Sequence, residues 1–401
     1  MSKTTRTEHC LNQYTLAIQK AYGINDATKQ FSLSEPMEIK LRQKILESDA
    51  FLKELSLLDV DQIQGQVIDV GTGTLMTGRG DNARFRAYPG KDGIKYELVE
   101  TDSCWAVTWA ELAVWGNSGT EGQFIKLMTN NANKNFALDM LKIGFNGIKV
   151  ARPTAPSTYP LGQDVNKGWQ QFVKERAPEQ IVTTPVYLDA GGKGTYKNLD
   201  SMVQDLINSQ IDPVYQNDPN LVVLVGRDLV SAEQHRLLEA ADTPTEHKAA
   251  QSLAKTIAGR KAYVPPFFPG KRVVVTFLKN LQILTQKGSR RRKAADNEDR
   301  MQFESSYWRM EGYAVGRLEA YASFDESAVT IGPNPDAPQA APASLTLDAK
   351  EPKEPKEPKE PKEQESGADA QAKTKAGNKD KEATGNGPAS TADVAASLVS
   401  E

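Results

Sequence analysis

A glycine-rich turn carrying a lysine is the stretch whose residue types best suit phosphate chemistry. It runs Asp189-Ala-Gly191-Gly192-Lys193-Gly194-Thr195, directly after the apolar Val186–Leu188. Glycine amides and a lysine ahead of a helix can bind phosphate. The spacing Gly-x-x-x-x-Gly-Lys-Ser/Thr is absent, so a strand-to-helix turn is the favoured interpretation. An α/β nucleotide-dependent enzyme centred on residues 186–287 stays open as an alternative.

Other combinations that could support catalysis are weaker. Gly71-x-Gly73 resembles the opening of a dinucleotide fingerprint, but Met76 stands where the third glycine is needed. No serine, cysteine or histidine lies in a nucleophile motif, and the three histidines lack partners at metal-ligand spacing. We therefore expect no catalytic, cofactor-binding or metal-ligating residues and no enzyme activity.

The two cysteines, Cys10 and Cys104, are far apart and predict no disulfide framework. Cys104 lies in an apolar strand pattern, where we expect a small buried thiol.

One basic cluster stands out, formed by Arg290, Arg291, Arg292 and Lys293 after Ser289. It could contact nucleic-acid phosphate or the carboxylates of a neighbouring subunit. A solvated loop is the other interpretation. The acidic residues Asp296, Glu298 and Asp299 follow at once, which argues against strong affinity for DNA.

Charge is divided unevenly along the chain. Residues 1–332 hold 40 Lys and Arg against 39 Asp and Glu, while residues 333–401 hold 9 Lys against 13 acidic residues. A free DNA-binding domain would show a basic excess. The start of the chain lacks an apolar signal core, and no stretch approaches the roughly 18 apolar residues of a membrane span. We expect a protein made and kept in a cytoplasm.

The first hundred residues predict two helices and a long ribbon. Apolar residues at helical spacing indicate helices over about 8–21 and from Ser34 to about Ser48. Residues 61–108 read as a two-stranded excursion with a glycine-rich middle, whose second strand spans 94–109. An isolated ribbon is marginal in water, so this one is expected to lie on another surface.

A long amphipathic helix follows over 121–143. Thr120 and Gln123 form a capping box at its start, and Gly144 and Gly147 follow its end. One face is apolar throughout, comprising Ile125, Met128, Ala132, Phe136, Met140 and Ile143. A helix of this kind can act as a spine for a sheet packed along it.

Residues 186–287 look like a compact α/β unit. Helices are expected over 198–209, 228–240 and 246–258, and the continuous apolar run Leu221–Val225 predicts a strand covered on both faces. Strands are also expected over 272–278 and 281–284. Residues 300–324 predict two more strands, joined near Gly312.

The C-terminal stretch repeats Lys-Glu-Pro from Lys350 to Pro361 and holds little that is apolar. Proline at every third position excludes helix and sheet ladders, so disorder is expected over residues 333–401.

Several local stretches together resemble the major capsid protein of P-two-like tailed bacteriophages (the peduovirus group). They are Glu47-Ser-Asp-Ala-Phe51-Leu52, Ile143-Gly-Phe-Asn-Gly147, Gln163-Asp-Val-x-x-Gly168-Trp169, Tyr215-Gln-x-Asp218-Pro-x-Leu221-Val-Val, Val225-Gly226-Arg227 and Val264-Pro-x-Phe-Phe268-Pro. The resemblance implies an α+β fold of the Hong Kong 97 type, with an N-terminal arm, an extended β-hairpin loop, a spine-helix peripheral domain and an α/β axial domain.

The resemblance also implies domain bounds. Residues 1–58 would be the arm, 62–108 the extended loop and 186–287 the axial domain. Residues 109–185 and 288–332 would form the peripheral domain. Tyr96 and Trp105 on the extended loop would then contact a neighbouring subunit.

Members of this family are made as precursors and trimmed. The matching stretch, Thr28-Lys-Gln-Phe31-Ser32-Leu33, puts the expected cut between Phe31 and Ser32, so that about 1–31 is removed. The implied function is a shell of hexamers and pentamers around packaged double-stranded DNA, assembled in the host cytoplasm and kept in the virion. The implied partners are further copies, a scaffolding protein, a maturation protease, a portal protein and, weakly, DNA; no membrane is implied. The Lys-Glu-Pro tail has no counterpart in the family pattern.

A third possibility is a viral scaffold or adaptor with a charged tail. Scaffolds are largely helical and polar, whereas valine-rich and aromatic strands are predicted here at 221–225, 272–278 and 303–321.

Overall fold

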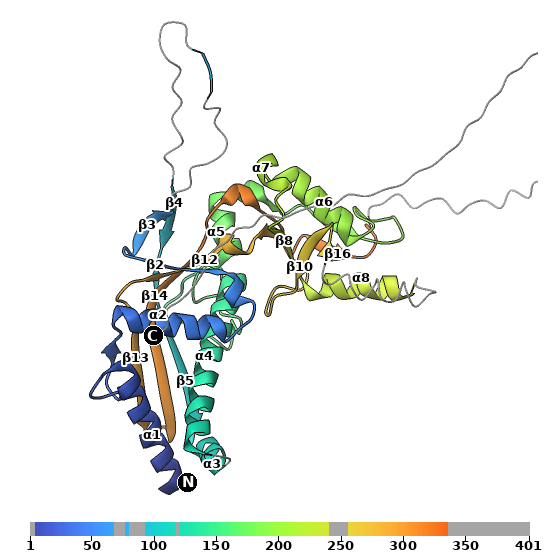
Figure 1. The fold of residues 1–401 in the computed structure, drawn as a ribbon. Coiled ribbons are helices and arrows are strands. Elements are labelled where there is room, and N and C mark those ends of the chain that lie inside the picture. Colours follow the sequence, from blue (N-terminus) through green and yellow to red (C-terminus); the bar gives the residue numbers. More distant parts are fainter. Residues whose placement is uncertain (1–4, 68–76, 80–92, 118–119, 240–255, 336–401) are drawn as a thin grey trace, which may run out of the picture. The chain divides into compact units, whose positions relative to one another are not determined.

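The computed structural model describes residues 5–67, 77–79, 93–117, 120–239 and 256–335 (Figure 1). Residues 1–339 form one unit, and residues 340–401 form a second that lies wholly outside the described ranges. The predicted disordered tail, residues 333–401, therefore falls outside them from residue 336 onward. Within the described ranges, no helix is both long and apolar enough to cross a membrane.

One six-stranded sheet is built around the 14-residue strand β14 (Gln302–Val315), and we call it the β14 sheet. Its order is β1-β13-β14-β12-β2, with β5 also paired to β14 over ten residues. The bounds are β1 (Phe31–Ser32), β2 (Ser56–Val60), β5 (Val99–Thr108), β12 (Leu281–Gln286) and β13 (Arg291–Asn297).

The predicted turn at Gly312 is wrong. Gly312 lies inside β14, where a Cβ atom would come within 2.8 Å of the carbonyl oxygen of Glu97. Glycine is needed here because another backbone approaches closely, and not because the chain turns. The second predicted strand, β15 (Tyr321–Phe324), belongs to a different sheet.

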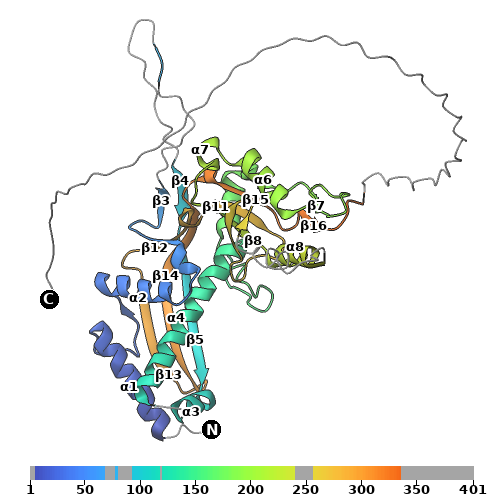
Figure 2. The same cartoon turned by 45° about the vertical axis from the view of Figure 1, so that its right-hand side comes forward.

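The spine helix, α4 (Glu121–Asn146), runs beside β5 in both ribbon views (Figures 1 and 2). Its capping box at Thr120 and Gln123 forms as predicted, and its apolar face is buried from Met128 to Ile143. The helix continues past the predicted end because Gly144 remains helical and lets the Trp169 ring lie against it. Gly147 then caps the end.

The second six-stranded sheet, which we call the β8 sheet, has the order β6-β15-β11-β8-β10-β9. Besides β15, its strands are β6 (Ile181–Val182), β8 (Leu221–Val225), β9 (Thr256–Ile257), β10 (Arg260–Tyr263) and β11 (Val273–Phe277).

Strand β8 is buried at all five positions, as predicted for a strand covered on both faces. Val222 and Leu224 join the large core that contains α4 and the β14 sheet. Leu221, Val223 and Val225 join a second core with helix α6 (Leu199–Gln210). The predicted helix at 228–240 is α8 (Arg227–Glu239). The helix expected at 246–258 lies mostly outside the described residues, and its last described residues form strand β9 instead.

The remaining strands form two small two-stranded sheets. β7 (Val186–Leu188) pairs with β16 (Val329–Ile331), and β3 (Gln64–Val67) pairs with β4 (Ile94–Glu97). The β3–β4 pair is the described base of the predicted extended loop. Residues 68–76 and 80–92 of that loop lie outside the described ranges.

The extended loop was predicted to span residues 62–108, but the part from residue 99 onward belongs to a sheet. Residues 99–108 are β5, which pairs with β14 at every position, so they belong to the β14 sheet and not to a ribbon. The inward face of β5 is formed by Thr101, Ser103, Trp105 and Val107, the positions that alternate with Cys104. Cys104 therefore points outward and is exposed, so the expectation of a buried thiol there is wrong, whereas Cys10 is buried.

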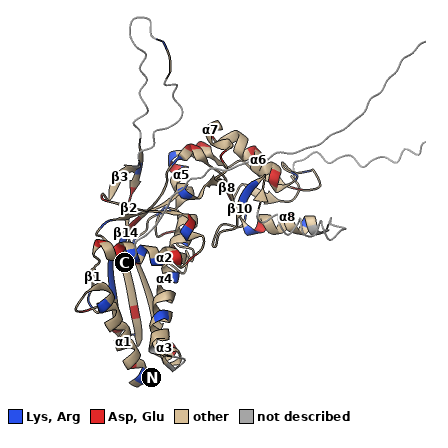
Figure 3. Ribbon diagram, in the orientation of Figure 1, with Lys and Arg blue, Asp and Glu red and all other residues tan. Residues whose placement is uncertain are grey.

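The N-terminal segment forms two helices, α1 (Thr5–Tyr22) and α2 (Glu35–Glu47). Both predicted helices are confirmed. Strand β1 lies between them in sequence and pairs with β13, Phe31 opposite Arg292 and Ser32 opposite Arg291. Figure 3 shows acidic and basic residues intermixed over the described ribbon, with a basic stretch on β13 beside β1.

Candidate assembly surfaces

Helix α2 is fastened by a knot of four charges, of which Arg290 and Glu38 are buried and Arg42 and Asp59 are half-buried. Arg290 and Glu38 are 2% and 3% exposed, and Arg290 Nη1 lies 3.1 Å from Glu38 Oε2. The second Arg290 nitrogen, Nη2, donates to Asp59 of β2. Arg42 donates to the other oxygen of Asp59 at 2.6 Å. Two arginines and two carboxylates thus neutralise one another where α2, β2 and the β12–β13 turn meet.

The protonation of Arg290 is secured by this setting. Burial acts to lower its pKa, but Tyr307, Asp59 and Glu38 outweigh that effect and raise it. A buried ion pair is strongly destabilising to break, because removal of one partner leaves the other charged and unsolvated. The knot therefore fixes α2 to the subunit.

Helix α1 is held in a different way. Cys10, Leu11 and Tyr14 are its buried side chains in a small apolar core. The Tyr14 ring meets Phe303 edge-on, with 5.6 Å between ring centroids. The remaining buried members of this core come from α3 (Trp109–Asn117), α4 and the β14 sheet, namely Val107, Leu112, Phe124, Met128 and Ala294. Apolar packing is the main attachment of α1.

Arg292 is the point where α1 meets a buried charge. It is 7% exposed, yet among the described residues no carboxylate lies within ion-pair distance of it. Its Nη1 donates to the Tyr22 hydroxyl at 3.1 Å and its Nη2 to Ser305 Oγ at 3.3 Å. The rings of Tyr22 and Phe136 lie 6.0 Å from the guanidinium carbon. Burial would lower the pKa of Arg292, but the surrounding tyrosines Tyr22, Tyr14 and Tyr307 raise it.

Arg309, a third buried arginine on the same face of the β14 sheet, is paired with a carboxylate. Arg309 and Glu311 are both fully buried and paired with each other. Arg309 Nη1 also donates to Ser103 Oγ at 2.9 Å, and Glu311 accepts from the Tyr313 hydroxyl at 2.9 Å. Burial and the Glu311 carboxylate raise the pKa of Tyr313, which keeps its hydroxyl protonated as a donor. Arg292 differs from both other arginines in having only neutral partners.

The predicted basic contact cluster is therefore split by the sheet. Successive side chains of a strand point to opposite faces. Arg290 and Arg292 are buried within the untrimmed subunit and therefore do not lie on its surface. Arg291 and Lys293 are exposed, and Arg291 lies over the Trp308 ring at 5.4 Å.

The predicted cleavage residues lie at an accessible site. Phe31 is half-buried and packs on Tyr22 at 5.6 Å between ring centroids, while Ser32 is exposed. The three preceding residues, 28–30, are also exposed. They border a cavity of about 430 Å³ that Asp102, Arg291 and Trp308 also line.

The two predicted loop contacts have different surroundings. Tyr96 lies on β4, half-buried across from Gly65, with its hydroxyl 3.4 Å from the Gln62 carbonyl oxygen. Trp105 lies in β5 and stacks on Trp115 with 6.3 Å between ring centroids. Tyr96 is thus at the base of the loop, whereas Trp105 belongs to the packing of the β14 sheet. Whether either residue contacts another subunit stays a prediction.

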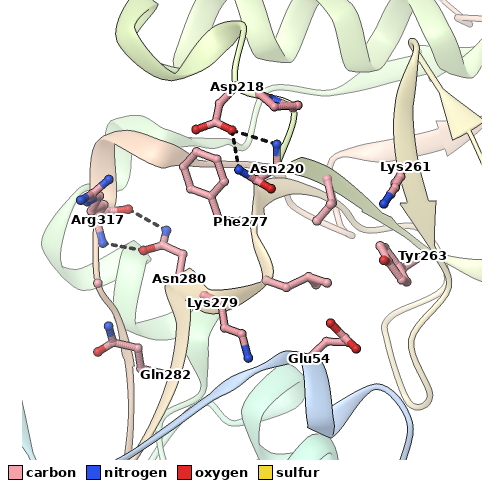
Figure 4. A pocket seen from close by; sticks show the side chains of 14 residues that line it. Glu54, Asp218, Asn220, Lys261, Tyr263, Phe277, Lys279, Asn280, Gln282 and Arg317 are labelled. Carbon is pink, nitrogen blue, oxygen red and sulfur yellow. Dashed lines mark hydrogen bonds between the residues drawn. The ribbon is translucent and has the colours of Figure 1, made fainter. Parts of the chain in front are cut away.

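A cavity of about 700 Å³ lies beside β10 and the β11–β12 connection (Figure 4). Its polar side chains include Lys261, Lys279 and Arg317. Several lining groups are already engaged with one another: Asp218 accepts from Asn220, and Asn280 bridges the Arg317 backbone. Its lining holds no serine, threonine, cysteine or histidine, and the described residues form no metal-type cluster.

The phosphate-loop candidate is likewise engaged internally. The Gly192 amide donates to the Asp189 carbonyl oxygen at 3.2 Å, and the Lys193 amide donates to the Asp189 carboxylate at 3.1 Å. These amides are not free to cradle a phosphate, and the segment is a tight turn between β7 and α6.

Sequence reasoning missed the carboxylate partners of the arginines. Glu38 lies in a segment that was predicted only as a helix, and Asp59 lies in the segment that follows it. The alternation of buried and exposed positions along β13 is the signal that could have shown which arginines need a carboxylate.

Most of the chain is similar to known phage capsid proteins. The family model described as phage major capsid protein, P2 family, matches residues 10–327. The chain is 30% identical to the capsid proteins of Escherichia phage P2 over 336 residues, 78% of this chain and 93% of the relative. It is 26% identical to the major capsid protein of Serratia phage KSP20, over 66% of this chain and 79% of that one.

The fold also matches a solved assembly. A chain of the satellite phage P4 procapsid, in a structure that includes the size determination protein, superposes with a TM-score of 0.65. It is 24% identical, and the match covers 82% of this chain and 99% of that one. The predicted α+β fold of the Hong Kong 97 type is confirmed. The chain belongs to the P2 family of phage major capsid proteins.

Proposed function

We propose that this major capsid protein assembles, as hexamers and pentamers, into an icosahedral head that encloses double-stranded DNA. The match of residues 10–327 to the capsid family carries the proposal. A scaffolding protein, a maturation protease and a portal protein are the partners expected during assembly, and DNA is contacted weakly and without sequence specificity. The role is structural, with no catalysis of its own.

The division of the chain follows from the same proposal. Residues 1–58 act as the arm and 186–287 as the axial domain. Residues 109–185 and 288–332 form the peripheral domain, and the extended loop begins at 62 and ends before β5. The two cores, one around α4 and one around α6, support separate peripheral and axial parts.

Trimming between Phe31 and Ser32 is supported by the local structure. The bond lies in a short strand with only two paired positions, next to the exposed residues 28–30. A protease binds its substrate as an extended strand, so little has to unfold before cleavage. The cut would release α1 and leave α2 with its ion-pair knot.

Co-expression with the scaffold and protease, followed by negative-stain electron microscopy, tests the function. Closed shells of uniform size are expected. Mass spectrometry of the subunits from these shells should show a chain that begins at Ser32. A subunit that stays monomeric at every concentration with both partners present would contradict the shell proposal.

The nucleotide-enzyme alternative is tested by thermal shift with nucleotides and Mg²⁺. We expect no saturable rise in melting temperature, because the Gly192 and Lys193 amides are already hydrogen-bonded within the chain.

A further inference from the structure

We propose that removal of residues 1–31 uncovers Arg292 as a carboxylate-binding site, which a second copy of this chain then fills. This inference rests on the proposed trimming and goes beyond it. It assigns a function to the one arginine of the β13 face that lacks an acidic partner.

Arg292 is shielded from solvent largely by residues 1–31, the segment that trimming would remove. Tyr22 supplies one of its two hydrogen bonds, and Phe31 is its paired residue in β1. Tyr14 of the same segment adds its hydroxyl to the surroundings of the guanidinium. After trimming, Ser305 and the Phe136 ring would remain beside it.

A guanidinium has five N–H donors, and a buried charge is costly unless it is paired. Arg290 and Arg309 are each paired with carboxylates inside the subunit. Arg292 in the untrimmed chain is only partly satisfied, by two neutral hydroxyls. Loss of Tyr22 would leave Arg292 with the Ser305 hydroxyl alone. A carboxylate could then replace the lost tyrosine hydroxyl with a stronger, charge-assisted hydrogen bond.

The surroundings identify the occupant as protein and not nucleic acid. Departure of α1 would also uncover its apolar floor: Val107, Leu112, Phe124, Met128 and Phe303, each no more than 4% exposed at present. Phosphate backbones bind open surfaces rich in cations. The Arg292 guanidinium beside an apolar recess suits a protein segment that carries a carboxylate next to apolar side chains.

A second copy is the partner that the assembly supplies. In a closed shell made of one chain, a newly exposed apolar face of one subunit lies among copies of the same protein. A large exposed apolar patch is unfavourable in water, so its burial between copies would stabilise the trimmed shell. Trimming would thereby convert an internal contact into one between subunits.

Arginine labelling with phenylglyoxal, read by peptide mass spectrometry, tests this directly on the wild-type chain. Three DNA-free samples are compared: precursor shells made with an inactive protease, trimmed shells, and subunits dissociated from trimmed shells. Arg292 should react at least about tenfold faster in the dissociated subunits than in either shell, the ratio given by about 1.4 kcal/mol of protection. Arg291, exposed on the same strand, is the internal reference.

Other outcomes overturn the proposal. Fast labelling of Arg292 in trimmed shells would show that no second copy covers it. Slow labelling in dissociated subunits would show that trimming does not uncover it. Protection that appears only in DNA-filled particles would make DNA the occupant. Shells that keep residues 1–31 would remove its basis, while absence of shells would instead refute the proposed function.

Arg292→Met, with Arg291→Met as the matched control, supplies a second test. In precursor shells Arg292→Met should leave the melting temperature unchanged or raise it, because it removes a buried charge that has no acidic partner. In trimmed shells it should lower the melting temperature by about 2–4 °C relative to the unsubstituted trimmed shell. Equal effects in both kinds of shell would contradict an ion pair formed after trimming.

Discussion

Both helices of the arm pack apolar side chains into the subunit, and α2 adds a knot of ion pairs around the buried Arg290. Helix α2 is held by four charges that pair in a knot around Arg290 and Asp59. Helix α1 buries Cys10, Leu11 and Tyr14 in a small apolar core, and its Tyr22 hydroxyl accepts a hydrogen bond from the buried Arg292. The predicted cut separates the two. A knot of this kind cannot be opened without stranding a charge, whereas an apolar contact can be released and replaced by another.

This difference gives each half a physical role. A segment that must stay in place while a shell changes is stabilised by interactions with no good alternative partner. A segment that must leave is better held by contacts that another surface can reproduce.

Arg290→Met should be the most damaging change. It leaves the buried Glu38 without its cation and the half-buried Asp59 with Arg42 alone, and we expect a loss of about 3–5 kcal/mol in the free energy of unfolding of the unassembled subunit. Urea denaturation followed by tryptophan fluorescence measures it. Arg291→Met, one residue on but exposed, should stay within about 0.5 kcal/mol of the wild type. Similar losses for both variants would mean that the knot does not hold α2.

Tyr14→Ala should release α1 and spare the rest of the subunit. Loss of the ring on Phe303 is expected to cost about 2–3 kcal/mol of α1 docking, less than a full core deletion because the helix can detach locally. Hydrogen exchange should rise over residues 5–22 and stay unchanged over 35–47. Faster exchange in both helices would show that the arm behaves as one unit.

Gly312→Ala tests the close approach behind β14. The added Cβ would lie 2.8 Å from the Glu97 carbonyl oxygen and 2.9 Å from Leu98 Cδ2. We expect a cost of about 1–2 kcal/mol, and displacement of the β3–β4 base next to it. Gly23→Ala, where the Cβ would meet open space but the φ is +65°, separates the steric cost from backbone strain. An unchanged melting curve for Gly312→Ala would contradict the packing described here.

Tyr96→Ser should change the subunit least and the assembly most. Tyr96 is half-buried on the loop base, so its loss is expected to alter subunit stability by less than about 1 kcal/mol while lowering shell yield. Trp105→Ser is the contrasting variant, because Trp105 packs in the sheet and should destabilise the subunit itself by about 2 kcal/mol. Normal shells from Tyr96→Ser would remove Tyr96 from the set of intersubunit contacts.

Sequence patterns predicted the elements whose burial is uniform. The capping box and apolar face of α4, and the continuous apolar run of β8, depend only on local spacing. The family resemblance added the fold, which local spacing alone did not define. These are features in which neighbouring residues carry the whole signal.

The carboxylate partners of the buried arginines could not be predicted from the sequence, because they are far away along the chain. Glu38 and Arg290 are 252 positions apart, so nothing near either residue shows that they meet. A run of basic residues is usually solvated, and only the strand alternation of β13 places every second one inside. The parity of β5 was misjudged similarly, because the small residues Cys104 and Ala106 resemble an inward face more than they form one.

Hydrogen–deuterium exchange on precursor shells tests the central claim, that the two halves of the arm are held differently, most directly. Amides of α1 should exchange through local opening at rates at least about tenfold faster than amides of α2, whose release requires breaking the Arg290 knot. Equal protection of the two helices, or faster exchange in α2, would contradict the account.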